Sequence, residues 1–300
     1  MTEEGKYVCV GLGEILWDML PAGKQLGGAP ANFAYHAQAL GAQGAVVSCI
    51  GEDELGREIV TRLDELGLDR SYLAADKSHP TGTVTVELDE HGKPDYTIHE
   101  NVAWDFIPWE PRLAELAART DAVCFGSLCQ RSEVSHRAVR DFLEATRTEC
   151  IRLFDINLRQ SYFNKGIVQT MLESSNVLKL NDEELPVVAA LLDLAGSEDE
   201  LFSRLTEAYA LQMIALTRGA HGSRLYARGH SCEHGGFPAQ IADTVGAGDS
   251  FAAAIALGLL YGRTLDEINA FANRLASFVC SQNGATPRLP DGLAAEFGER

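Results

Sequence analysis

The stretch Asp243-Thr-Val-Gly-Ala-Gly-Asp-Ser-Phe251 leads directly into Ala252-Ala-Ala-Ile-Ala-Leu-Gly-Leu-Leu260, which is strongly apolar. This order predicts a glycine turn followed by the buried amino-terminal end of a helix. Gly246, Ala247 and Gly248 are too small to shield their backbone N–H groups, and a helix start carries about half a positive charge. These residues are therefore expected to form a pocket for an anion, such as a phosphoryl group in transfer.

Asp249 is the acidic residue at the rim of this predicted anion pocket. Phosphate repels a carboxylate, so a carboxylate at this position indicates a functional role. The role that we expect is to take a proton from a hydroxyl that attacks phosphorus. In the alternative interpretation, Asp249 or Ser250 simply caps an ordinary helix.

The composition limits the classes of protein and of partner. A chain of 300 residues can form one large domain, residues 1–300, with a small appendage. Its net charge of −18 argues against binding to nucleic acid or to an anionic membrane, since both need basic surfaces. The seven cysteines form no CxxC pair, the first residues are polar and acidic, and no long apolar run exists, so a cytoplasmic protein is expected.

Short apolar runs alternate with segments of helical spacing along most of the chain. Runs that are apolar on both faces predict buried parallel strands, and their alternation with helices predicts an α/β fold with a doubly wound, mostly parallel sheet between helices. Ligands then bind at the carboxyl ends of the strands. The predicted strands are residues 7–10, 45–50, 122–125, 151–155, 177–180 and 213–217, and the predicted helices are residues 31–40, 55–66, 133–146, 166–173, 182–192 and 198–209.

Two segments interrupt this alternation. Residues 15–26 have no helical periodicity, and residues 83–98 alternate apolar and polar side chains around a turn at 89–93, which indicates a hairpin. We expect a small β-sheet lid over the strand ends, built from residues at about 15–27 and 80–105. An apolar face on such a lid also predicts a homodimer through it.

The first predicted strand is followed by Val10-Gly-Leu-Gly-Glu14, which suggests a dinucleotide-binding loop. The third glycine of that motif is missing because position 16 is leucine, which argues against a dinucleotide oxidoreductase. Asp18 and Gly27-Gly-Ala-Pro-Ala-Asn32 follow. Gly28 allows close backbone approach and Asn32 offers a donor and an acceptor for vicinal hydroxyls, although Asn32 alone also fits a satisfied polar residue on a helix.

Polar side chains also follow the later strands. Asn157 and Arg159 come after one strand, and Lys179 closes the next. Asn181 and Glu184 are three apart, so they can hold a hydrated Mg²⁺ or form a variant capping box. After residues 213–217, the segment from Thr217 through Gly219 to Gly222 can line a nucleotide site or form a plain turn.

In order and spacing, several of these motifs resemble the ribokinase-like (PfkB) sugar kinase family, and within it the bacterial fructokinases most. The resemblance covers nearly the whole chain. It rests on Gly13-Glu14 with Trp17-Asp18, Gly27-Gly28 to Asn32, residues 51–56, Asn181-x-x-Glu184 and residues 243–251.

The resemblance implies transfer of the γ-phosphoryl group of ATP to a sugar hydroxyl, with Mg²⁺ as cofactor. It implies Asp249 as the base, the 246–248 backbone as the anion hole, and Asp18, Gly28 and Asn32 as sugar ligands. It places Asn181 and Glu184 near Mg²⁺, and Asp243 with the Val245 carbonyl at a monovalent-cation (K⁺) site that some relatives have. The implied nucleotide contacts are Lys179, Thr217, Gly219, Gly222, Asn273 and Ser277, besides Gly246 and Gly248.

Three features of the sequence bear on which sugar is the substrate. Residues 101–105 resemble a lid segment of fructokinase-like members, in which Trp104 either packs on the sugar or belongs to the core of the lid. Ala29 stands where the ribokinase signature has lysine, which favours fructose over ribose, while Arg159 fits an acidic sugar such as 2-keto-3-deoxygluconate. A non-catalytic sugar sensor on the same fold is the alternative of a different class, although the base and the anion-hole glycines are both present.

Overall fold

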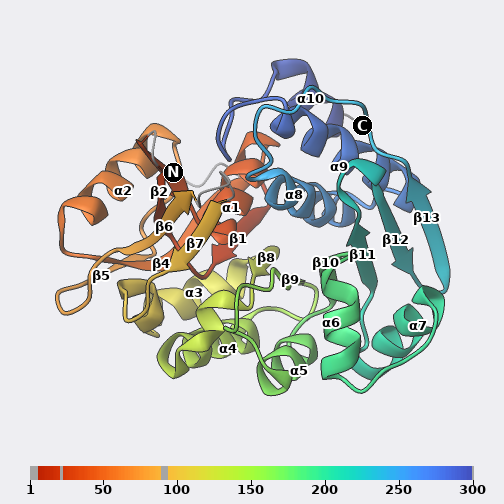
Figure 1. Ribbon diagram of the computed structural model, residues 1–300, viewed down its shortest axis with the longest axis horizontal. Helices are drawn as coiled ribbons and strands as arrows, with labels where there is room; N and C mark the ends of the chain where they lie inside the picture. The colour runs from red at the N-terminus through yellow and green to blue at the C-terminus, as the bar shows by residue number, and fades with distance from the viewer. Residues whose placement is uncertain (1–5, 21–22, 89–93, 299–300) are drawn as a thin grey trace.

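The computed structural model describes residues 6–20, 23–88 and 94–298, and its centre is a nine-stranded sheet (Figure 1). Strands β1, β4, β5 and β8 to β11 run parallel, and β12 and β13 are antiparallel at one edge. The predicted doubly wound, mostly parallel sheet is thus confirmed. The strand order is β13 (His230–His234), β12 (Ser223–Ala227), β11 (Met213–Thr217), β10 (Val177–Asn181), β9 (Ile151–Asp155), β8 (Ala122–Phe125), β1 (Val8–Leu12), β4 (Gln43–Gly51) and β5 (Leu73–Asp76).

Helices cover both faces of this sheet, because its strands bury side chains on both sides. On β1, Val10 and Leu12 pack towards α3 to α7, whereas Cys9 packs towards α1, α8 and α9. The helices are α1 (Ala29–Ala39), α2 (Glu54–Glu65), α3 (Pro111–Arg119), α4 (Glu133–Ala145), α5 (Lys165–Glu173), α6 (Glu184–Leu191), α7 (Glu198–Tyr209), α8 (Ala247–Leu260), α9 (Leu265–Cys280) and α10 (Asp291–Gly298).

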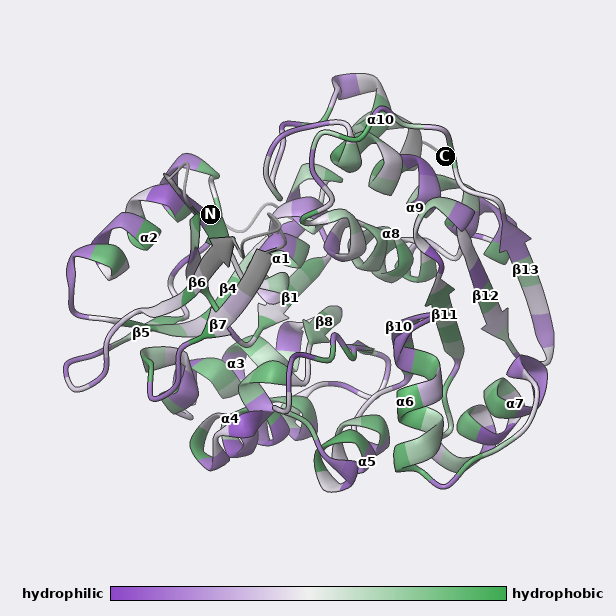
Figure 2. Ribbon diagram, in the orientation of Figure 1, coloured by the Kyte–Doolittle hydropathy of each residue, from purple (hydrophilic) through white to green (hydrophobic). Residues whose placement is uncertain are grey.

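Helix α8 is buried along most of its length. Residues 250–258 are all buried, and in Figure 2 this helix is mostly green, the colour of hydrophobic residues. A helix that is apolar all round needs partners on every side. Here α1 and α9 supply two of them and the sheet a third, which fixes the position of the helix start at residues 246–249.

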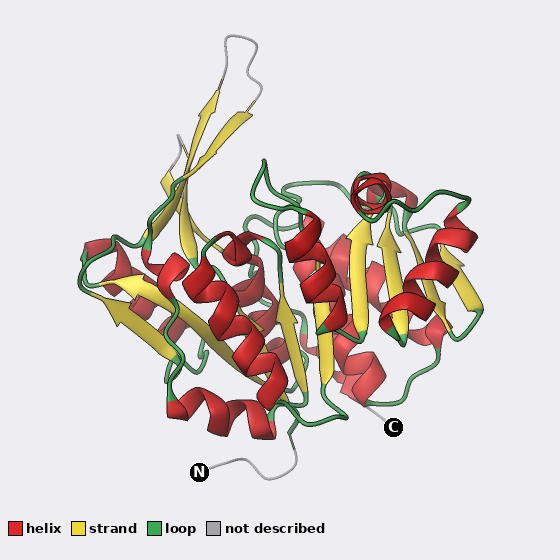
Figure 3. Cartoon of the chain, turned by 90° about the horizontal axis from the view of Figure 1, so that it is seen from below, coloured by secondary structure: helices red, strands yellow, loops and turns green. Residues whose placement is uncertain are grey.

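A second, four-stranded sheet stands off the main body, as Figure 3 shows. Its order is β3 (Gly23–Gly27), β2 (Leu16–Leu20), β6 (Gly82–Leu88) and β7 (Pro94–Ile98), so both interrupting segments contribute two strands. The expected turn at residues 89–93 lies outside the described residues. We call this element the small sheet.

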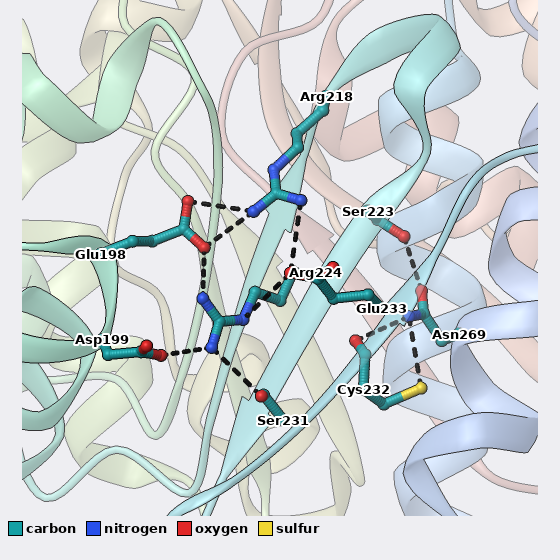
Figure 4. A network of polar contacts seen from close by, with 9 residues as sticks. All are labelled: Glu198, Asp199, Arg218, Ser223, Arg224, Ser231, Cys232, Glu233 and Asn269. Carbon is teal, nitrogen blue, oxygen red and sulfur yellow. Dashed lines mark hydrogen bonds and ion pairs between the residues drawn. The ribbon is translucent and has the colours of Figure 1, made fainter.

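The antiparallel edge of the main sheet is held by ion pairs (Figure 4). Arg224 Nη1 lies 2.7 Å from Glu198 Oε1, and Arg218 Nη2 lies 2.8 Å from the same oxygen. Glu198 begins α7, so these pairs join the helix to β12 and to Arg218, which directly follows β11. Among the described residues, no helix has the length and apolar character needed to cross a bilayer.

Candidate active site

A cavity of about 780 Å³ lies at the carboxyl ends of β9, β10 and β11, between the first turn of α8 and the small sheet. This is the position at which open α/β sheets bind ligands. Leu16, Val84 and Ile98 of the small sheet form its apolar wall. Its charged lining residues are the carboxylates of Glu14, Asp18, Asp155, Glu184, Asp243 and Asp249 and the cations Arg159 and Lys179.

The start of α8 has the geometry that the glycine motif predicts. Gly246 adopts φ of 80°, and a Cβ there would lie 2.4 Å from the carbonyl oxygen of Ala285, so only glycine fits. Gly246 and Gly248 line the cavity. Ala247 is not among the lining residues, and its N–H points to the Thr244 oxygen at 3.4 Å.

Asp249 lies in the first turn of α8 and faces the cavity. Its Oδ2 accepts a hydrogen bond of 2.8 Å from Asn32 Nδ2. Burial, together with the negative charge of Asp155, raises the pKa of Asp249 to about 6, against the lowering effects of Asn32, Lys179 and Arg159. The helix has no side-chain capping bond, so the capping interpretation of Asp249 and Ser250 is wrong.

Asp155 and Lys179 form a buried ion pair on neighbouring strands. Lys179 Nζ donates to both oxygens of Asp155, at 2.8 and 2.7 Å, and each side chain is only 7% exposed. Burial lowers the pKa of Lys179, but the charge and hydrogen bonds of Asp155 outweigh it and leave that pKa raised. The ammonium therefore keeps its charge beside Gly248, where a Cβ would lie 3.4 Å from Nζ.

Asn181 and Glu184 form a reciprocal cap at the start of α6. Asn181 Oδ1 accepts from the N–H groups of Glu183 and Glu184, while Glu184 Oε2 accepts from the N–H of Asn181. Glu184 Oε1 accepts from the N–H of Leu158 at 2.8 Å. Both side chains also line the cavity, so the capping role and a role towards a ligand coexist.

The segment after β1 and the start of α1 also line the cavity. Gly28 has φ of 111°, and a Cβ there would lie 2.4 Å from the Glu14 carbonyl oxygen, so the close approach of the two segments requires glycine. Glu14 Oε2 is buried without a hydrogen-bond partner, as is Asn32 Oδ1. Burial raises the pKa of Glu14 to about 7 and that of Asp18 to about 6.

Asp243 belongs to the loop before α8. Its Oδ1 accepts from the N–H of Val245 and its Oδ2 from the N–H of Gly284, at 3.1 and 3.2 Å. Asp243 and Val245 both line the cavity. Within residues 6–20, 23–88 and 94–298, no three His, Cys, Asp or Glu side chains cluster as a metal site would need.

Comparison with known proteins assigns the chain to a family. The sequence profile described as "pfkB family carbohydrate kinase" matches residues 22–292. The chain belongs to the pfkB family of carbohydrate kinases. A fructokinase of Salmonella typhimurium is 30% identical over 260 residues, which are 83% of each chain.

Two solved structures share the fold of this pfkB kinase. Fructokinase of Xylella fastidiosa with bound ATP has a TM-score of 0.82 at 19% identity and covers 98% of this chain and 99% of its own. Fructokinase of Vibrio cholerae O395 with fructose, ADP and calcium has a TM-score of 0.80 at 23% identity, with the same coverage. As a carbohydrate kinase, the chain is a phosphotransferase that acts on a sugar hydroxyl.

The structure brings most of the predicted site residues of the kinase to one cavity. The predicted residues that line it are Asp18, Gly28, Asn32, Asn157, Arg159, Lys179, Asn181, Glu184, Thr217, Asp243, Val245, Gly246, Gly248 and Asp249.

Trp104 lies elsewhere in the pfkB kinase. Its side chain is fully buried, does not line the cavity, and packs against the guanidinium of Arg131 at 4.0 Å. A ring without exposed surface has no face left for a sugar, so its interpretation as a core residue holds. The apolar wall comes from the strands of the small sheet instead.

Four predicted nucleotide contacts of the kinase also lie outside this cavity. Asn273 Nδ2 donates to Ser223 Oγ in a buried polar cluster, so its amide is used within the protein. Ser277 donates to the Phe237 carbonyl oxygen. Gly219 and Gly222 have positive φ in a short turn, as their plain-turn interpretation predicts.

Glu14 and Asp155 are cavity residues that were not among the predicted site residues of the kinase. Glu14 stood in the Gly13-Glu14 motif, and Asp155 ended a predicted strand, so their positions at strand ends were the only signal in the sequence. Their burial and pairing depend on distant segments. Residue type alone does not reveal them.

Proposed function

We propose that this kinase transfers the γ-phosphoryl group of ATP to a hydroxyl of a neutral sugar, with fructose as the preferred acceptor and fructose 6-phosphate as the product. The observation that carries the proposal is the Asp249 carboxylate, held by Asn32 at the positive end of α8 inside the cavity. A carboxyl with a pKa of about 6 is ionised at neutral pH and basic enough to accept a proton in transfer.

In this mechanism the acceptor hydroxyl lies against Asp249. Its proton passes to the carboxylate as the oxygen attacks phosphorus. The N–H groups of Gly246 and Gly248 and the helix start stabilise the charge on the phosphoryl oxygens. The products are a sugar phosphate and ADP, and Asp249 then loses its proton to solvent.

The ATP phosphates are assigned to the wall that Lys179 and Thr217 share with α8. Both Glu184 oxygens already accept one backbone N–H each, and their remaining lone pairs suit the waters of a hydrated Mg²⁺. Bound there, Mg²⁺ neutralises phosphate charge. Asp243 and the Val245 carbonyl form the proposed K⁺ site, which a comparison of rates with and without K⁺ tests.

The charges of the cavity support a neutral acceptor. Glu14, Asp18 and Asp249 line the side of the cavity that we propose for the sugar, and Arg159 is the one cation among the lining residues that we propose for that side. A carboxylate-bearing sugar would meet more negative than positive charge. The relative named fructokinase, at 30% identity, makes fructose the first neutral sugar to test.

Arg159 favours a second candidate. An acidic sugar such as 2-keto-3-deoxygluconate would pair with its guanidinium. Ribose is the remaining neutral candidate, and Ala29 disfavours it. A non-catalytic sugar sensor is the alternative outside the kinases.

The deciding experiment is a coupled ADP-release assay with Mg²⁺ and ATP, with and without K⁺. The acceptors are fructose, ribose, 2-keto-3-deoxygluconate and nucleosides, and kcat/KM is compared. We expect the highest value with fructose. A higher value with 2-keto-3-deoxygluconate would replace fructose by an acidic sugar, and sugar binding without any ADP release would support the sensor.

The proposal includes a homodimer through the small sheet and a cytoplasmic location. Met19 and Tyr96 of that sheet expose 37% and 53% of their surface. Light scattering of the wild type and of a Met19→Glu variant tests the dimer.

All seven cysteines carry free thiols, which suits the reducing compartment that a cytoplasmic location provides.

A further inference from the structure

Strand β7 is the edge strand of the small sheet, and side chains of the main body hold its outer edge. β7 pairs only with β6 among the described strands, so the carbonyl groups on its other side need different donors. Gln160 Nε2 donates to the Tyr96 oxygen at 2.6 Å. Tyr162 Oη lies 3.3 Å from the Ile98 oxygen and donates to Glu100 Oε1 at 2.9 Å.

Arg131 supplies a further hydrogen bond just beyond the carboxyl-terminal end of β7. Arg131 Nη2 donates to the His99 oxygen at 2.6 Å, and its guanidinium pairs with Asp105. The guanidinium also lies between two rings, 4.0 Å from Trp104 and 4.6 Å from Tyr162. The side chains of Arg131 and Asp105 are only 7% and 5% exposed, whereas Gln160 is exposed and bonds to the Tyr96 carbonyl.

The loop that carries Gln160 and Tyr162 also reaches the cavity. Asn157, Arg159 and Gln160 itself line it, and the N–H of Leu158 donates to Glu184 Oε1 at 2.8 Å. Asn157 and Gln160 adopt φ of 45° and 46°, a region that residues other than glycine rarely occupy. The loop thus joins β7, the sugar side of the cavity and the start of α6.

We propose that Gln160 is a positioning residue, which holds β7 over the cavity while the acceptor sugar is bound and does not itself take part in phosphoryl transfer. This inference rests on the proposed function, because it takes the cavity as the sugar site. Tyr96, whose carbonyl Gln160 holds, and Ile98 both line that cavity. The bond from Gln160 is single and exposed, so it can break and re-form as sugar enters and product leaves.

The test compares Gln160→Ala with Gln169→Ala, which changes the same residue type on α5 outside the cavity. For Gln160→Ala we expect the sugar KM to rise about three- to tenfold, the change that loss of one exposed hydrogen bond produces. The ATP KM and kcat stay within about twofold, because the Asp249 end of the site is untouched. We expect Tyr162→Phe, which keeps the ring against Arg131, to raise the sugar KM as well.

Amide hydrogen exchange without substrate gives a second readout. We expect β6 and β7 to exchange faster in Gln160→Ala than in wild type, with β9 to β11 unchanged, and no difference in Gln169→Ala. Wild-type values of both sugar KM and exchange in Gln160→Ala would overturn the inference. If the wild type phosphorylates no sugar, the proposed function fails, while the exchange of β6 and β7 still decides whether Gln160 holds the strand.

Discussion

Asn32 Nδ2 donates a hydrogen bond of 2.8 Å to Asp249 Oδ2, across 217 positions of the sequence. The bond joins the starts of α1 and α8, the two helices that begin at glycine turns beside the cavity. It leaves Asn32 Oδ1 buried without a partner. The hydrogen bond therefore links Asn32, which we propose binds the sugar, directly to the proposed base.

Asp249→Asn removes the proton acceptor while keeping the size of the side chain. We expect kcat to fall by about 10² to 10⁴-fold, the usual contribution of a positioned base, with sugar and ATP affinity retained. Steady-state kinetics and titration calorimetry check this. Ser250→Ala, one position further along α8, is the control that should keep its rate; turnover of Asp249→Asn near the wild-type value would disprove the assignment.

Asn32→Ala is expected to raise the sugar KM more than the ATP KM. Asn32 is buried on the wall formed by α1, whereas Lys179 and Thr217, proposed to face ATP, lie on β10 and β11. Initial rates measured against each substrate in turn give both constants. Equal increases in both would contradict the placement of Asn32 on the sugar side.

The pH dependence should show an acidic limb near pH 6. As the proposed base, Asp249 has to be ionised, so kcat/KM for the sugar should fall as the pH decreases through its pKa of about 6. The hydrogen bond from Asn32 lowers that pKa, so Asn32→Ala should move the limb to higher pH. Asp18 and Glu14 titrate in the same range, so the limb belongs to the coupled group. If the acidic limb of Asn32→Ala lies at the wild-type pH, the limb does not report the pKa of Asp249.

The Asp155–Lys179 pair should matter strongly for stability. Lys179→Met leaves a buried carboxylate without its cation, which costs about 3–5 kcal/mol of unfolding free energy. The double variant Asp155→Asn with Lys179→Met should recover part of that loss, because no buried charge then lacks a partner. Urea unfolding of the three proteins measures both values, and a loss below about 1 kcal/mol in Lys179→Met would mean that water reaches the carboxylate.

The alternation of strands and helices was predictable because the parallel strands are apolar on both faces. The pair β12 and β13 was missed because its residues are partly exposed and polar, which resembles a loop in sequence. Helix α3 was also missed, although Pro111 at its start and Leu113, Leu116 and Ala117 at helical spacing were readable signals.

The sequence by itself determined the glycine turn at 246–248, the acidic residue behind it and the alternation of buried strands with helices, because backbone conformation and burial on two faces restrict residue type locally. Only the tertiary structure decided that Asn32 meets Asp249, that Asp155 neutralises Lys179, and that Trp104 lies in the core. These contacts join segments far apart in the chain. Their distances, and the desolvation that raises the pKa of Asp249, exist only once the helices have packed on the sheet.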